Sequence, residues 1–310
     1  MNTLLKAGTL AAATISLAFN NTSVAQDTPV ATDHTWTDIT YAKPDGLELL
    51  ARIYRPEVTT GTLPVVISVH GGAWGAYDRT SGKLYDEALA EEGYLVVAID
   101  FRQSPDYQHP DGSADVTAAV RWVRLNADSL GANPDQIGLI GSSSGGHLAL
   151  LAAVRPNDQS HLGTPIRGES DDFTAHDEID ASVDYVVAMW PVSSPITRYR
   201  YAQRAGIDQL VSLTERYFSD ENAMWDASIP RIVTAGEAGD LPPILVIQPG
   251  MDSNIPQDMT FDLLKAWQSR GGKVDYAFYP GAAHAFGHRP SEDTDDMLKA
   301  ITAFIARVSD

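Results

Sequence analysis

The feature that most constrains the fold is a repeated alternation of short apolar runs, rich in Val and Ile, with amphipathic helical segments. PVVISVH at 64–70 and LVVAID at 95–100 are apolar at successive positions, which is typical of strands buried on both faces. Such strands belong to parallel sheets whose right-handed helical crossovers cover both faces. We therefore predict an α/β fold with a mostly parallel, doubly wound sheet. The expected strands are 47–54, 64–70, 95–100, 136–140, 183–189, 244–248 and 274–279, and the expected helices are 83–92, 115–126, 144–154, 259–270 and 291–308.

The stretch 191–240 breaks this regular alternation, because it separates two predicted core strands by about fifty residues. It contains five aromatic residues, namely Tyr199, Tyr201, Tyr217, Phe218 and Trp225. Segments inserted at such points lie over the carboxyl ends of the strands, where ligands bind in open α/β sheets. We expect a small lid-like insertion, or pocket wall, within one domain spanning 26–310. An ordinary helical crossover with a long loop is the alternative.

The first 25 residues have the pattern of a secretory signal peptide. Lys6 precedes a 13-residue apolar run at 7–19, and Ser23-Val24-Ala25 provides the small residues of a cleavage site. The run is too short to cross a bilayer, and no stretch of 18 apolar residues occurs elsewhere. We expect cleavage near Ala25 and an exported protein, periplasmic or secreted. An amphipathic N-terminal helix is the alternative.

Charge and composition exclude several classes of function. The formal net charge is −19, from 22 basic and 41 acidic residues, which disfavours nucleic-acid partners and anionic lipid surfaces. The absence of Cys excludes disulfides, thiolate metal sites and a Cys nucleophile. Six acidic residues at 169–180 could bind calcium, but their spacing favours a solvated loop. We expect no metal and no cofactor.

The strongest motif is Gly141-Ser142-Ser143-Ser144-Gly145, of the form G-x-S-x-G. It follows the predicted strand QIGLI and precedes the helix SGGHLALLAAV, which is the context that the motif requires. A sharp strand-to-helix turn lifts the central Ser143 above the sheet edge, and only small residues fit around it. This arrangement predicts that Ser143 is a nucleophile for acyl transfer.

A second motif, HGGAW at 70–74, stands at the carboxyl end of the strand PVVISVH. Acyl transfer needs amide hydrogens directed at the developing oxyanion, and glycine lets the backbone approach closely. We expect the amides of Gly72, Ala73 and Ser144 to form this oxyanion hole.

Two late loops supply the remaining candidates. GMDSNIP at 250–256 follows the strand ILVIQ, and GAAHAF at 281–286 follows VDYAFY. The chain order Ser143, Asp252, His284 is the order expected on such a sheet. His284 would act as the general base, and Asp252 would orient its imidazole.

Other residues compete for these roles. His147 lies one turn along the nucleophile helix, so a structural role is favoured. His288 is four residues from His284 but does not directly follow the strand. Asp275 is the alternative acid, although it falls within a predicted strand.

Several of these motifs resemble those of a known family. HGGAW (70–74), DFRQSP (100–105), GSSSGG (141–146), GMDSNIP (250–256) and HAF (284–286), with HPDGSADVTAAVRWV at 109–123, resemble the α/β-hydrolases. The closer resemblance is to hormone-sensitive-lipase-like esterases and to bifunctional feruloyl and acetyl xylan esterases. HGGAW in place of HGGG and DFRQSP in place of DYRLAP favour the second branch. The resemblance implies a Ser-His-Asp carboxylester hydrolase without metal or cofactor, and it suggests that Trp74 lines the substrate site. Trp190 is the second candidate for substrate binding.

The expected function is therefore hydrolysis of short-chain or carbohydrate-linked esters of the acetyl or feruloyl type. The expected partner is a small-molecule or polysaccharide-linked ester substrate. An amidase, exopeptidase or kynurenine-formamidase-like hydrolase of the same fold is the nearest alternative. A catalytically silent binding protein is the alternative from another class.

Overall fold

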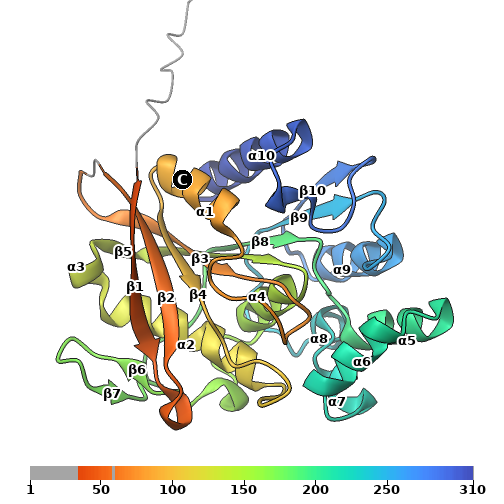
Figure 1. Ribbon diagram of the computed structural model, residues 1–310, viewed down its shortest axis with the longest axis horizontal. Helices are drawn as coiled ribbons and strands as arrows, with labels where there is room; N and C mark the ends of the chain where they lie inside the picture. Colours follow the sequence, from red (N-terminus) through yellow and green to blue (C-terminus); the bar gives the residue numbers. More distant parts are fainter. Residues whose placement is uncertain (1–33, 58–59, 310) are drawn as a thin grey trace, which may run out of the picture. The chain divides into compact units, whose positions relative to one another are not determined.

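One mixed sheet organises the molecule (Figure 1). The computed structural model describes residues 34–57 and 60–309. Within these residues ten strands are arranged in the order β10-β9-β8-β5-β3-β4-β2-β1-β6-β7. Neighbours from β10 to β4 run parallel, and the pairs from β4 to β7 run antiparallel. The prediction of an α/β fold with a mostly parallel sheet is confirmed.

The strands are β1 (His34–Ala42), β2 (Leu49–Pro56), β3 (Leu63–Val69), β4 (Leu95–Ile99), β5 (Ala132–Ser142), β6 (Ile166–Arg167), β7 (Phe173–Thr174), β8 (Tyr185–Met189), β9 (Ile244–Pro249) and β10 (Val274–Tyr279). The α-helices are α1 (Lys83–Glu91), α2 (Asp111–Leu125), α3 (Ala127–Leu130), α4 (Ser144–Val154), α5 (Pro195–Ala205), α6 (Asp208–Tyr217), α7 (Glu221–Asp226), α8 (Ile229–Ala235), α9 (Gln257–Ser269) and α10 (Glu292–Ser309).

The predicted core strands all form, with ends displaced by up to four residues. Three strands at the antiparallel side of the sheet, β1, β6 and β7, were not predicted from the sequence. Much of β1 is exposed, and its sequence HTWTDITYA has no apolar run. Strands of this kind are half solvated, so they lack the continuous apolar signal of the central strands.

Helices cover both faces of the sheet and create two apolar cores. Side chains of β3 divide between them, because successive residues of a strand point to opposite faces. Val65, Ile67 and Val69 pack with residues of α2, α4, α8 and α9. Val66 packs with residues of α1 and α10 on the other face. The nucleophile motif at the end of β5 thus stands between two rigid layers.

The insertion 191–240 is helical throughout most of its length. Its four helices are α5 to α8, of which α5, α6 and α7 lie together at one end of the molecule (Figure 1). Helix α8 packs against α4 and α9, as an ordinary crossover helix does. The insertion therefore divides into a crossover helix and a group of three outlying helices.

The predicted signal peptide lies outside the described residues. Among the helices of the described part, none is both long enough and apolar enough to cross a membrane.

Candidate active site

Ser143 occupies a strained turn between β5 and α4. Its backbone has φ 54° and ψ −118°, a conformation that residues with a side chain rarely adopt. Two interactions hold the turn: the Ser143 amide donates to the Met189 carbonyl at 2.9 Å, and the Ser143 carbonyl accepts from the Val192 amide at 3.1 Å. These contacts with the end of β8 and the residues after it stabilise the strained conformation of Ser143.

Glycine is required on both sides of this turn. A Cβ at Gly145 would lie 2.2 Å from the Val69 carbonyl oxygen, and one at Gly141 would lie 2.4 Å from the Gly145 carbonyl oxygen. Real Cβ atoms do not approach backbone oxygens so closely. Both glycines of the G-x-S-x-G motif are thus explained by close packing of the turn against β3 and α4.

The structure brings the three residues predicted from the motifs into one line of hydrogen bonds. Asp252, after β9, accepts from His284 Nδ1 at 2.8 Å through Oδ2. His284, after β10, has Nε2 3.1 Å from Ser143 Oγ. With the proton on Nδ1, Nε2 is free to accept the Ser143 hydroxyl hydrogen. This is the geometry that an activated serine requires.

Asp252 is held rigidly and out of solvent. Its side chain is 1% exposed, whereas that of His284 is 20% exposed. The second carboxylate oxygen, Oδ1, accepts from the amides of Asn254 and Ile255 at 2.8 and 2.9 Å. These two hydrogen bonds fix the orientation of the carboxylate. Its Oδ2 atom then holds the His284 imidazole so that Nε2 lies near Ser143 Oγ.

The HGGAW loop lies directly beside this cluster. Gly72, Ala73 and Trp74 have φ of 104°, 51° and 60°, so three successive residues adopt left-handed backbone conformations. A Cβ at Gly71 would lie 3.3 Å from Ser143 Cβ, which shows how closely the loop approaches the nucleophile turn.

Two amides of this loop and one amide of α4 are available for a ligand. The Trp74 amide donates to Ser144 Oγ at 3.2 Å, which fixes the loop against α4. Within residues 34–57 and 60–309, the amides of Gly72, Ala73 and Ser144 donate to no protein acceptor. Free amides beside a nucleophile are suited to bind an oxyanion.

The competing histidines and acid have other partners. His147 is fully buried, accepts from Trp74 Nε1 at 3.3 Å and lies 2.9 Å from the Ala227 carbonyl. Its burial lowers its pKa to about 4, so it is a neutral structural residue. His288 donates to the Ser81 carbonyl at 2.9 Å, and Asp275 pairs with an exposed arginine on α10.

The two tryptophans predicted to bind substrate are both 0% exposed. The structure therefore does not support direct contact of Trp74 or Trp190 with a ligand. The Trp74 ring is stacked on Tyr217 with centroids 5.3 Å apart. The Trp190 ring packs 6.3 Å from the His284 ring. Each side chain therefore packs behind the site, where burial of its large apolar ring stabilises the fold.

Sequence reasoning missed a buried ion pair behind the site. Arg102, in the DFRQSP motif, donates to Asp115 at 2.8 Å and also bonds Asp111 at 3.0 Å. Asp115 is fully buried and also accepts from the Arg102 amide at 2.7 Å. The motif letters contained both residues, but nothing in the spacing showed that they pair.

The burial of two further charged residues was also not predicted from the sequence. Asp86 in α1 is fully buried, and neither of its carboxylate oxygens has a hydrogen-bond partner. Arg198 in α5 is 1% exposed and has no carboxylate partner among the described residues. Neither residue belongs to a motif, so only tertiary structure reveals them.

No group of three or more His, Asp or Glu side chains in residues 34–57 and 60–309 could hold a metal ion. In the acidic stretch 169–180, Asp171 pairs with Arg167, and Asp180 accepts from Asn157 Nδ2 at 2.6 Å. These two carboxylates are occupied by local contacts.

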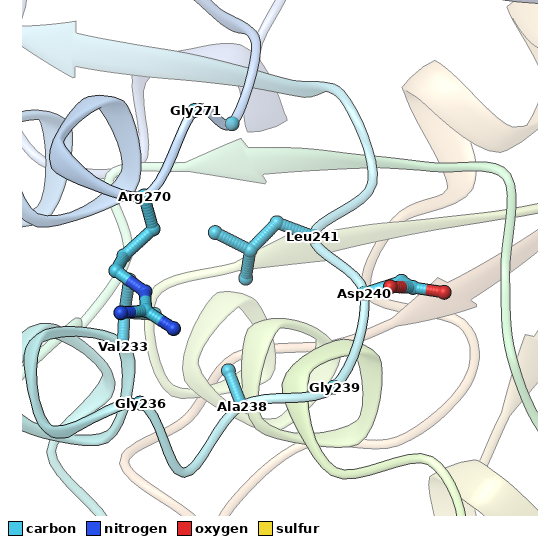
Figure 2. Close-up of a pocket in the computed structure, with 9 residues that line it drawn as sticks. Val233, Gly236, Ala238, Gly239, Asp240, Leu241, Arg270 and Gly271 are labelled. Carbon is cyan, nitrogen blue, oxygen red and sulfur yellow. The ribbon is translucent and has the colours of Figure 1, made fainter.

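A separate cavity of about 260 Å³ opens where α8 and α9 end (Figure 2). Its lining includes Arg270 and Asp240, whose side chains lie on opposite sides of it. None of the residues of the Ser143 cluster lines this cavity. Its lining contains no Ser and no His, so it does not compete with the Ser143 cluster as a candidate site for acyl transfer.

The parallel sheet, the strained Ser143 turn and the late Asp and His loops define an α/β-hydrolase fold. The chain belongs to the BD-FAE family, whose profile matches residues 51–267.

Individual relatives agree with this assignment. Esterase LipC of Mycobacterium tuberculosis is 28% identical over 274 residues, which cover 85% of this chain and 63% of LipC. The chain thus spans less than two thirds of that relative.

Among solved structures, a hyperthermophilic esterase from Pyrobaculum calidifontis has a TM-score of 0.70 and 25% identity, covering 89% of this chain and 87% of that one. An acetyl ester-xyloside bifunctional hydrolase from Caldicellulosiruptor lactoaceticus has a TM-score of 0.68 and 19% identity, with 85% and 89% covered. The second likeness concerns the fold alone.

Proposed function

We propose that this protein is a serine carboxylester hydrolase with Ser143 as nucleophile, His284 as general base and Asp252 as the residue that orients the imidazole. One observation carries the proposal: His284 lies 3.1 Å from Ser143 Oγ and 2.8 Å from Asp252 Oδ2. The esterase relatives and BD-FAE membership support the same activity.

The proposed reaction has two steps of the same kind. As Ser143 Oγ attacks the ester carbonyl carbon, its proton moves to His284 Nε2, and the carbonyl oxygen becomes negative. The amides of Gly72, Ala73 and Ser144 donate to that oxygen, each worth about 2.7–4 kcal/mol in comparable sites. The bond to the alcohol then breaks, and the alcohol leaves with the proton from His284. Water repeats the sequence on the acyl-enzyme and releases the acid.

The proposed substrates are short-chain or carbohydrate-linked esters of the acetyl or feruloyl type. Support comes from membership of the BD-FAE family and from the segments HGGAW (70–74) and DFRQSP (100–105), which resemble those of the bifunctional feruloyl and acetyl xylan esterases. A panel of p-nitrophenyl acetate, p-nitrophenyl butyrate, methyl ferulate and acetylated xylan tests this. Activity confined to butyrate and longer acyl chains would contradict the proposal.

The esterase names of the relatives favour ester over amide substrates. Matched acyl groups, such as p-nitrophenyl acetate and p-nitroacetanilide, separate the two. A higher kcat/KM for the anilide would favour the amidase alternative.

Ser143→Ala tests the nucleophile. We expect it to lower hydrolysis of p-nitrophenyl acetate by at least about 10³-fold without unfolding the protein. Ser142→Ala is the matched control: Ser142 is the preceding residue, and its hydroxyl makes no hydrogen bond to His284. Retention of most activity by Ser143→Ala would refute the assignment.

We also propose that the protein is exported after cleavage near Ala25, and that α5–α7 form a wall or lid of the substrate pocket. The Tyr201 hydroxyl in α5 donates to the Ser253 carbonyl at 2.9 Å, which joins this segment to the loop that carries Asp252.

The export proposal has a separate test. N-terminal sequencing of the exported protein shows whether cleavage has occurred, and a retained Met1 would contradict the proposal.

A further inference from the structure

Helix α5 buries an arginine for which the described residues provide no opposite charge. Arg198 is 1% exposed, and Nη2 donates to Thr214 Oγ1 in α6 at 2.7 Å. Its Nε has no hydrogen-bond partner, and no carboxylate in residues 34–57 or 60–309 pairs with it. Burial lowers its pKa to about 10, so the group remains charged at neutral pH. An unpaired buried charge is costly, and a specific interaction must offset that cost.

The interaction that the structure provides is a cation–π contact. The Arg198 guanidinium carbon lies 5.0 Å from the centroid of the Trp74 ring, within the range of an attractive contact. The same indole stacks on Tyr217, with an interplanar angle of 2°. Phe218 meets it edge-on at 5.1 Å. The outlying helices thus enclose one tryptophan with a charge and two rings.

That tryptophan belongs to the loop beside the nucleophile. Its amide donates to Ser144 Oγ at 3.2 Å, and its Nε1 donates to His147 Nδ1 at 3.3 Å. Both partners stand on α4, which begins directly after Ser143. Trp74 and Ala73 also have positive φ, so the loop needs external support to keep its conformation.

We propose that Arg198 is a positioning residue for the oxyanion hole: its charge holds the Trp74 ring, and the ring holds the strained loop so that the amides of Gly72 and Ala73 face Ser143. This inference rests on the proposed function. It assigns α5 and α6 a part in catalysis besides that of a pocket wall. Displacement of catalytic groups by about 1 Å costs on the order of 10²-fold in rate, so a contact of this kind is functionally significant.

The experiment compares Arg198→Met, Arg198→Lys and Arg200→Met with p-nitrophenyl acetate as substrate. Methionine keeps most of the buried volume but removes the charge, whereas lysine keeps the charge. Arg200 is the matched control, because it lies on the same helix and pairs with Glu221 at the surface. We expect Arg198→Met to lower kcat by about 10- to 100-fold with KM changed less than about threefold. Lysine should recover at least about fivefold over methionine, and Arg200→Met should stay within about twofold of the wild type.

A positioning role predicts a loss in kcat with little change in KM, and recovery of kcat by lysine. A purely structural role predicts neither result. Thermal unfolding identifies variants that do not fold. If Arg198→Met is unfolded, Thr214→Val replaces it, because this change removes the hydrogen-bond partner of Nη2 and keeps the buried volume. Thr214→Val should lower kcat by about 3- to 10-fold.

Three results would overturn the inference: a folded Arg198→Met with kcat within about twofold of the wild type, equal kcat for methionine and lysine, or a folded Thr214→Val with wild-type kcat. If the proposed function itself fails, the wild-type protein does not hydrolyse the ester, or Ser143→Ala remains active. The two failures are therefore distinguishable.

Discussion

Asp86 offers a sharp test of how burial controls charge in this protein. It lies in α1, is 0% exposed, and both of its carboxylate oxygens lack a hydrogen-bond partner. Burial raises its pKa to about 7, and the nearby Ser68 hydroxyl opposes the shift only in part. Replacing it with Asn keeps the shape of the side chain and removes the ionisation. We expect Asp86→Asn to stabilise the folded protein at neutral and alkaline pH.

The pH dependence follows from proton linkage. In the unfolded chain Asp86 ionises near its ordinary value of 3.8, whereas in the folded protein it stays protonated up to about 7. Between these values the folded state binds more protons than the unfolded state, so the free energy of unfolding of the wild type falls as pH rises. Above pH 7 the loss is complete. At about 1.4 kcal/mol for each pH unit, the full effect is about 4 kcal/mol.

Urea unfolding of the wild type and Asp86→Asn at pH 4.5, 6, 7 and 8 measures this effect. The difference in free energy of unfolding between the two should grow in favour of the variant from pH 4.5 to 7 and then level off. Glu92→Gln, an exposed residue just past the same helix, is the control and should change stability by less than about 0.5 kcal/mol at each pH. A difference for Asp86→Asn that does not change with pH would refute the reasoning.

Three other substitutions test the frame of the site. Gly145→Ala places a Cβ 2.2 Å from a backbone oxygen, so it should prevent correct formation of the nucleophile turn; a soluble variant with wild-type kcat would contradict this. Asp115→Ala leaves the Arg102 charge without its buried partner and should destabilise the protein by about 3–5 kcal/mol in urea unfolding, whereas a loss below about 1 kcal/mol would argue against the pair. Asp252→Asn should lower kcat by about 10³- to 10⁴-fold with the fold retained, because the amide no longer holds the required tautomer of His284; a loss of less than tenfold would point to another acid.

The central sheet and the Ser143 cluster were predictable because their signals are local. A parallel strand buried on both faces is apolar at successive positions, and the loop at its carboxyl end begins where that run stops. Ser143 directly follows β5, and Asp252 and His284 lie in the loops that follow β9 and β10. Parallel strands end at one edge of the sheet, so residues that are distant in sequence were expected to meet there.

The buried supports of the site were not predictable, because they depend on contacts between distant segments. The letters HGGAW place Trp74 in the oxyanion loop, but they do not show that Arg198 and Tyr217, on two much later helices, pack against its ring. An arginine in a polar helix such as α5 is ordinarily solvated, so the sequence gives no sign that Arg198 is buried. Strand β1 was not predicted for a different reason: its polar residues face solvent, so it has no continuous apolar run.

The central claim is that one serine hydroxyl is activated by the neighbouring imidazole. Reaction of the folded protein with a fluorophosphonate probe, followed by peptide mapping, measures this directly, because the probe phosphonylates a serine made nucleophilic by its surroundings. We expect one probe per chain, located on Ser143, and no labelling of His284→Ala. A wild-type protein that stays unlabelled, or a label found on Ser142 or Ser144, would contradict the account.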